Sequence, residues 1–125
     1  EGTRIHKILE LLDLTNPDIE KLLPKDQKLI KGFINHPFIK SLNIINHYHE
    51  YHFITTQDEV QINGIIDLII ETEESYYIID YKLYDTNKEE YTKQLNIYKN
   101  YLSNIVNKPV HSYLYSIIKN DFTKV

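Results

Sequence analysis

Residues 59–82 read EVQINGIIDLIIETEESYYIIDYK, and this stretch decides the fold. Apolar side chains alternate through residues 59–71, whereas residues 76–82 are apolar on both faces. These patterns predict two successive strands joined by the Glu-Glu-Ser turn between them, the second strand being central in its sheet. One carboxylate interrupts each apolar run, at Asp67 and at Asp80. A hairpin about this turn would bring the two carboxylates close together.

The chain around this hairpin predicts an α/β fold, a mixed sheet with helices on its faces. Apolar residues recur at helical spacing before the hairpin and again after it, and proline or asparagine interrupts the early segments. Gly64 interrupts the first strand, as at a bulge or a close approach of another group. The expected helices are residues 3–14, 18–23, 25–35, 38–45 and 87–105, and the further strands are residues 48–55 and 110–118.

Composition limits the class of protein. The chain has 125 residues and a mass of 15.0 kDa, which predicts one domain over residues 1–125. It has no Cys, which excludes disulfides, thiolate metal sites and an iron–sulfur cluster. No apolar stretch approaches 18 residues and no leader precedes the first helix, so we expect a cytoplasmic protein outside the membrane. Met is absent, so we expect a piece of a longer chain.

The charge balance bears on partners. There are 14 Lys and Arg against 18 Asp and Glu, giving a formal net charge of −4. A free-standing nucleic-acid binder is usually basic, because neutralising phosphates supplies much of its affinity. The chain alone is therefore expected to bind DNA poorly, and a partner domain is expected to supply the remaining DNA affinity.

The two strand carboxylates suggest a chemistry. A buried carboxylate is costly without a cation or donors nearby, and two adjacent carboxylates repel unless they share a proton or a metal. Lys82 follows Asp80 by two residues, so both lie on one face of the strand. Two carboxylates with an ammonium suit metal-assisted hydrolysis of phosphodiesters. Mg²⁺ is the expected ion, because it is a hard cation that prefers oxygen ligands. The alternative is a structural role, in which Asp67 and Asp80 bond loop amides or pair with Lys82.

Four short motifs then resemble the PD-(D/E)XK nuclease superfamily, in particular its RecB/AddA-like branch. They are Gly2-Thr3-Arg4-Ile5-His6, Gly64-Ile65-Ile66-Asp67, Asp80-Tyr81-Lys82 and Gln94-Leu95-Asn96-Ile97-Tyr98. All four occur in the family's order, from residue 2 to about residue 118. The resemblance implies a restriction-endonuclease-like sheet, and the missing cysteines point to the type without an iron–sulfur cluster.

The resemblance also implies roles for individual residues. His6, Asp67 and Asp80 would bind Mg²⁺ or Mn²⁺, with the main-chain carbonyl of Tyr81 as a further ligand. Lys82 would position and activate the attacking water. Gln94 and Tyr98, one helical turn apart, would contact DNA or steady the lysine, although Tyr98 also suits core packing. Glu50 occupies a place where similar domains often carry an acidic residue, and its role stays open.

The resemblance implies a Mg²⁺-dependent deoxyribonuclease of exonuclease type. It would be the C-terminal nuclease module of a helicase–nuclease in double-strand-break repair and recombination, with a helicase in the same chain and a partner subunit. Two alternatives are a catalytically silent docking module with the nuclease fold and a stand-alone restriction- or resolvase-type endonuclease. The segment His47-Tyr48-His49-Glu50-Tyr51-His52 also resembles a metal box. On a strand, however, His47 and His49 share one face and His52 points to the other, which favours edge-strand histidines.

Overall fold

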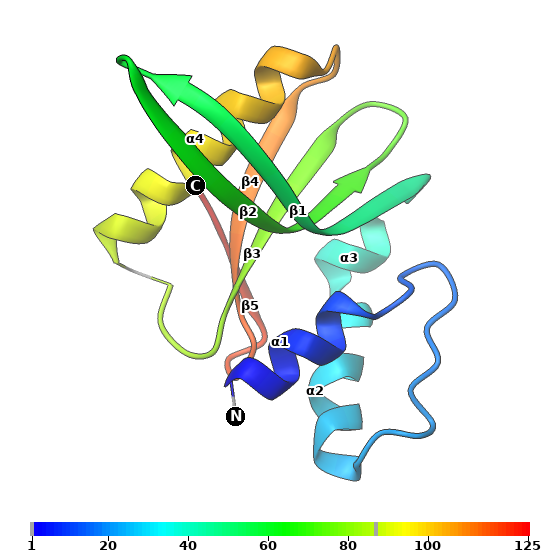
Figure 1. Ribbon diagram of the computed structural model, residues 1–125. Helices are drawn as coiled ribbons and strands as arrows, with labels where there is room; N and C mark the ends of the chain where they lie inside the picture. Colours follow the sequence, from blue (N-terminus) through cyan, green and yellow to red (C-terminus); the bar gives the residue numbers. More distant parts are fainter. Residues whose placement is uncertain (1, 87) are drawn as a thin grey trace.

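The structure is a computed structural model that describes residues 2–86 and 88–125. These residues form one mixed five-stranded sheet flanked by helices (Figure 1). The expected α/β class is therefore confirmed. The helices are α1 (Gly2–Glu10), α2 (Pro24–Ile34), α3 (Pro37–Ser41) and α4 (Glu89–Ile105), and the strands are β1 (Asn46–Gln57), β2 (Val60–Glu71), β3 (Tyr76–Lys82), β4 (Val110–Ser116) and β5 (Asp121–Lys124).

The sheet has the order β1-β2-β3-β4-β5, so β3 is central, as its two-sided apolar pattern predicts. Strands β1, β2 and β3 pair antiparallel through short turns. Strand β4 pairs parallel with β3, and a parallel connection needs a long crossover, which α4 supplies. Strand β5 then returns antiparallel along β4. In Figure 1 the β1–β2 hairpin bends away from the lower half of β3.

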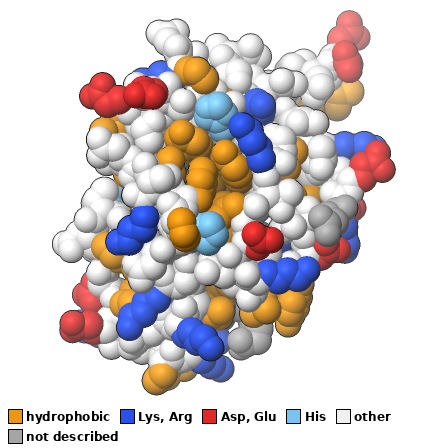
Figure 2. Space-filling view, turned by 180° about the vertical axis from the view of Figure 1, so that it is seen from behind, with side chains coloured by type: hydrophobic (Ala, Val, Ile, Leu, Met, Phe, Trp, Pro, Cys, Tyr) orange, Lys and Arg blue, Asp and Glu red, His pale blue; other side chains and the backbone are white. Residues whose placement is uncertain are grey.

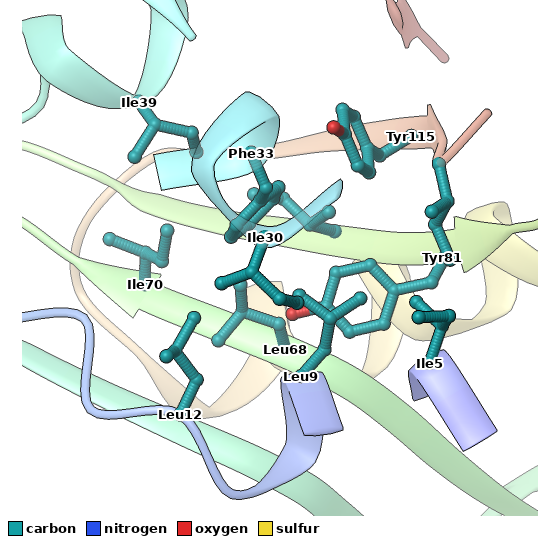
Figure 3. Packing of buried hydrophobic residues seen from close by; sticks show 12 residues of the cluster. Ile5, Leu9, Leu12, Ile30, Phe33, Ile39, Leu68, Ile70, Tyr81 and Tyr115 are labelled. Carbon is teal, nitrogen blue, oxygen red and sulfur yellow. The ribbon is translucent and has the colours of Figure 1, made fainter. Parts of the chain in front are cut away.

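The two faces of the sheet bury two apolar clusters. One cluster packs α1, α2 and α3 against the sheet, and Figure 3 shows Phe33 and Ile30 of α2 beside Tyr81 and Tyr115 of the strands. The other cluster packs Leu95, Tyr98 and Leu102 of α4 against β2, β3 and β4. Among the described residues, no helix has the length and apolar character that crossing a membrane requires.

Several local expectations differ from the structure. The helix expected at residues 38–45 is shorter, since α3 ends at Ser41 and residues 42–45 are not helical. The prediction of a helix at residues 18–23 is wrong, since this segment forms turns. It is confined between Pro17 and Pro24, and so short a segment does not repay the cost of starting a helix. Helix α1 ends at Glu10 rather than at residue 14, although Leu12 stays buried. Strand β5 has no counterpart among the expected strands; it is formed by pairing with β4, and Phe122 packs on Tyr115 at 4.6 Å.

Gly64 lies where another side chain, Phe53, comes close to the backbone. This is one of the two roles expected for it, the other being a bulge. A Cβ added there would lie 2.3 Å from the ring of Phe53, which is buried and stacked on Tyr101. The ring would have to shift from its contacts with Tyr98 and Tyr101, so Gly64→Ala is expected to destabilise the fold by about 2 kcal/mol. Gly32→Ala in α2 is the matched control, because its nearest neighbour is 3.4 Å away and alanine favours helix. Urea unfolding of both variants measures this; equal stabilities would contradict the packing argument.

An ion pair fixes α1 on α2. The guanidinium of Arg4 donates to Oδ2 of Asp26, whose side chain is buried. Removing the cation leaves a buried carboxylate without its partner, so Arg4→Ala is expected to cost about 3 kcal/mol of unfolding free energy. Lys7→Ala, which breaks the exposed Lys7–Glu10 pair on the same helix, should cost less than about 1 kcal/mol. Thermal unfolding of the two variants measures the difference, and a similar loss in both would refute it.

Candidate active site

The site forms where β2 and β3 separate. Their pairing runs from the turn as far as Leu68 opposite Ile79, while β2 continues with β1 and β3 continues with β4. We call the point where β2 and β3 separate the fork. Asp67 on β2 and Asp80 on β3 are the first residues beyond the last paired residues, Leu68 and Ile79, so one carboxylate lies on each side of the fork. Both side chains are buried, with 9% of Asp67 and 4% of Asp80 exposed. The hairpin thus brings the two carboxylates together, as its sequence predicts.

Asp67 is held by donors on two sides. The Tyr81 amide donates to its Oδ2 at 2.9 Å, and Nε2 of His6 lies 3.0 Å from its Oδ1. Burial by itself would raise the pKa of Asp67, but the hydrogen bonds from His6 and the Tyr81 amide outweigh it and lower the pKa. The same hydrogen bond raises the pKa of His6 against the opposing effect of burial. Asp67 is therefore an ionised carboxylate with a fixed orientation.

Glu50 completes a group of possible metal ligands. One ligand atom each from His6, Glu50 and Asp67 lie within 4.8 Å of one another. Glu50 is in the middle of β1, opposite Asp67, yet its φ is 49°, in the left-handed region that residues other than glycine seldom adopt. Burial, and then the charge of Asp67, raise its pKa. A strained backbone that holds a carboxylate against two other ligands is typical of functional sites.

Asp80 and Lys82 form the other half of the site. Nζ of Lys82 lies 2.9 Å from Oδ2 of Asp80 and 4.2 Å from the centre of the Tyr91 ring in α4. Burial, and then the negative charge of Asp67, raise the pKa of Asp80 to about 7, although Lys82 opposes the rise. Without another cation, the pair of carboxylates therefore holds a proton near neutral pH.

Tyr91 is a site residue that the sequence motifs do not include. Its helical spacing indicates only that it shares the apolar face of its helix with Tyr98. Its position three residues before Gln94 is the signal that could have identified it, because side chains at that spacing share a helix face. The ring attracts the Lys82 ammonium through its electron-rich face and limits where that ammonium can move.

Gln94 and Tyr98 lie on α4, beside the strands that carry Asp67 and Asp80. Tyr98 is a core residue, 6% exposed and edge-on to Phe53 at 5.6 Å between ring centres. Burial, and then the charges of Asp80 and Asp67, raise its pKa to about 12, so its hydroxyl keeps its proton near both carboxylates. Gln94 is half-buried one turn earlier. Their roles toward DNA or the lysine stay predictions.

The histidines of β1 lie outside this group. His47 and His49 share one face, with Nδ1 of His47 2.9 Å from Nε2 of His49, and the other nitrogen of His47 lies 3.2 Å from Oδ1 of Asp13. His52 is exposed. The placement of His47 and His49 on one face is therefore confirmed, and the three rings do not converge on one point.

The site opens onto a groove of about 1060 Å³. His6, Glu50 and Lys82 line it, with Arg4 and Lys7 of α1 at its side. Its volume can hold a sizeable ligand, and its cations can attract negatively charged groups. The buried side chain of Tyr81 points into the core (Figure 3), so any contribution of Tyr81 to a metal would come from its main chain.

The donors present suit a divalent cation. His6, Glu50 and Asp67 supply an imidazole nitrogen and two carboxylate oxygens close together, a set that hard and intermediate ions accept. Asp80 lies outside this group and adds a carboxylate next to Asp67. The raised pKa of Asp80 is a second indication, because carboxylates this close need a positive charge between them to ionise together. The fit therefore rests on the chemistry of these donors and on their crowding.

Comparison with known proteins agrees with this geometry. A sequence model of the PD-(D/E)XK nuclease superfamily matches residues 1–124. An ATP-dependent helicase/nuclease subunit of type A from Staphylococcus epidermidis is 31% identical over 69% of this chain and 9% of its own length. The protein of the same name from Staphylococcus haemolyticus is 30% identical over 85% of this chain and 11% of its own length. The chain thus spans about a tenth of these relatives, and it belongs to the PD-(D/E)XK nuclease superfamily.

Proposed function

We propose that this chain is a metal-dependent deoxyribonuclease domain that hydrolyses phosphodiester bonds. The observation that carries the proposal is the fork between β2 and β3, where Asp67 and Asp80 lie beside His6, Glu50 and Lys82, and these three line an open groove. Membership of the nuclease superfamily supports the class of reaction. The carboxylate crowding supports the need for a divalent ion, for which Mg²⁺ and Mn²⁺ are the candidates.

Each residue then has a role. His6, Glu50, Asp67 and Asp80 would hold the ion, with the Tyr81 carbonyl as a further candidate ligand. When bound, the ion supplies Lewis-acid polarisation of the phosphate and lowers the pKa of a water. Lys82, held between Asp80 and the Tyr91 ring, donates a hydrogen bond to the attacking water and offsets negative charge that develops at phosphorus. Gln94 and Tyr98 steady this side of the site.

The wider setting is also part of the proposal. The relatives are named helicase/nuclease subunits and are about ten times longer than the matched region. We infer that this domain is the nuclease module of such a chain, acting on DNA ends in double-strand-break repair and recombination beside a helicase and a partner subunit. The net charge of −4 fits a domain that depends on neighbours for much of its DNA affinity.

Cleavage assays test the reaction. The chain is incubated with linear duplex and single-stranded DNA labelled at either end, and with covalently closed circles, in Mg²⁺, Mn²⁺ or EDTA. Cleavage in metal and none in EDTA is expected, and resistant circles would indicate an exonuclease. Asp80→Asn should abolish cleavage, whereas Asp18→Asn, an exposed acid remote from the fork, should not. Cleavage by Asp80→Asn equal to that by the unmodified chain would refute the proposal.

A further inference from the structure

Hydrophobic side chains gather between two histidines on the face of the molecule seen in Figure 2. A strip of aromatic rings that contact one another runs over β3, β4 and β5 beside α3. Ring contacts connect its members in sequence: His111 to Tyr77 at 5.3 Å, Tyr77 to Tyr113 at 6.4 Å, Tyr113 to Phe38 at 4.6 Å, Phe38 to Phe122 at 4.9 Å and Phe122 to His36 at 4.8 Å. Each member is only partly buried. The aromatic strip comprises His36, Phe38, Tyr77, His111, Tyr113 and Phe122.

The strip is separate from the candidate active site. Tyr77 and Asp80 lie three residues apart on β3, so their side chains leave opposite faces of the strand. Tyr77 belongs to the margin of the cluster formed by α1, α2 and α3, whereas Lys82 contacts α4. The strip is therefore not explained by the chemistry proposed at the fork.

Three of its rings have similar orientations, whereas Phe38 and Phe122 are steeply inclined to their neighbours. The planes of Tyr77 and His111 differ by 31°, and those of Tyr77 and Tyr113 by 33°. The strip lies at the edge of the hydrophobic core, since residues such as Phe33 and Tyr115 fill the interior beneath it. Such rings suit stacking with planar groups, because every nucleobase presents an aromatic face.

Cations accompany the strip. The exposed Lys40 lies on α3, two residues after Phe38, and Lys124 pairs with Tyr113 across β4 and β5. Lys99 and Lys124 are near enough to His111 to help lower its pKa, after burial as the main cause. Figure 2 shows Lys or Arg side chains on both sides of the apolar centre. Protein interfaces tend to lack lysine at their centres, whereas phosphates attract it.

From this combination we infer that the aromatic strip binds single-stranded nucleic acid, with bases stacked on the rings and phosphates near Lys40 and Lys124. The inference rests on the proposed function, from which it takes nucleic acid as the ligand. It deepens that function, since the strip would hold a strand outside the cleavage site. The rings supply an affinity that the net charge of the chain does not.

The test uses the 125-residue chain in EDTA, so that no cleavage occurs. Binding of fluorescein-labelled oligothymidylate of about 15 nucleotides is followed by anisotropy. Because the chain has no Trp, its emission comes from its 11 Tyr, and quenching that is lost in Tyr77→Leu or Tyr113→Leu reports stacking on the strip. Tyr77→Leu and Tyr113→Leu are each expected to weaken binding about ten-fold, whereas Tyr77→Phe should bind like the unmodified chain. Tyr48→Leu is the control, because Tyr48 is exposed on the edge strand β1.

The outcomes separate this inference from the nuclease proposal. If the chain cleaves DNA in metal but strip variants bind oligothymidylate unchanged, or if no binding occurs, the strip inference is overturned and the nuclease proposal stands. If strip variants lose binding while the chain does not cleave DNA in metal, the strip inference stands and the nuclease proposal is overturned. Sedimentation provides a further check: self-association that Tyr77→Leu abolishes, without a change in DNA binding, would make the strip an interface between copies and overturn the inference. Circular dichroism confirms that each variant is folded.

Discussion

Replacing Lys82 by Ala is expected to reduce DNA cleavage at least about 100-fold, since positioned charge at a reacting group contributes roughly this much. The ammonium lies 2.9 Å from Asp80 and 4.2 Å from the centre of the Tyr91 ring, so its position is set from two sides. Lys82 is not among the proposed metal ligands, so Mn²⁺ binding measured by calorimetry should persist. The loss should therefore appear in kcat rather than in metal affinity.

Lys88→Ala is the matched control for this prediction. Its ammonium also lies over the Tyr91 ring, at 5.8 Å, but it is exposed at the start of α4. Cleavage by this variant should stay within about two-fold of the unmodified chain. Asp67→Asn gives the opposite pattern, losing both Mn²⁺ binding and cleavage. Full activity in Lys82→Ala would show that the fork does not catalyse the reaction.

The metal-free chain is expected to lose stability as the pH rises from about 5 to about 8. The folded-state pKa of Asp80, about 7, lies above the unfolded value of about 3.9, so the folded chain holds a proton that the unfolded chain has lost. Unfolding free energy therefore falls by on the order of 2 kcal/mol as pH rises through this range. The raised pKa of His6 acts in the same direction, because its stabilising charge is lost at higher pH.

Urea unfolding in EDTA at several pH values measures this slope. Asp80→Asn should flatten it, and subtracting the two curves removes opposing contributions from His49 and His111, whose pKa values burial lowers. Adding Mn²⁺ at about pH 8 should restore stability, by about 2.7 kcal/mol at a hundred-fold excess over Kd. At about pH 5 the ion competes with protons and should restore less. A slope unchanged by Asp80→Asn would refute the assignment of the proton to this pair.

Much of the fold is readable in the sequence because its signals are local. The bounds of β3 match the predicted strand at residues 76–82, and its central place follows from apolar residues on both faces. Strand β5 carries no comparable signal, since its four residues become a strand only by pairing with β4. The segment 18–23 is the opposite case, because its apolar residues suggest a helix that the flanking prolines prevent.

By itself, the sequence determined the family, the hairpin that joins Asp67 to Asp80, and the placing of Lys82 on the face of Asp80, because each depends on residues close along the chain. Only the tertiary structure brought Glu50 to His6 and Asp67 and placed the Tyr91 ring against Lys82. It also joined rings from separate strands and a helix into the aromatic strip. These contacts join residues that are far apart in the chain. They are set by how the helices and strands pack together, and the local periodicity of the sequence does not encode that packing.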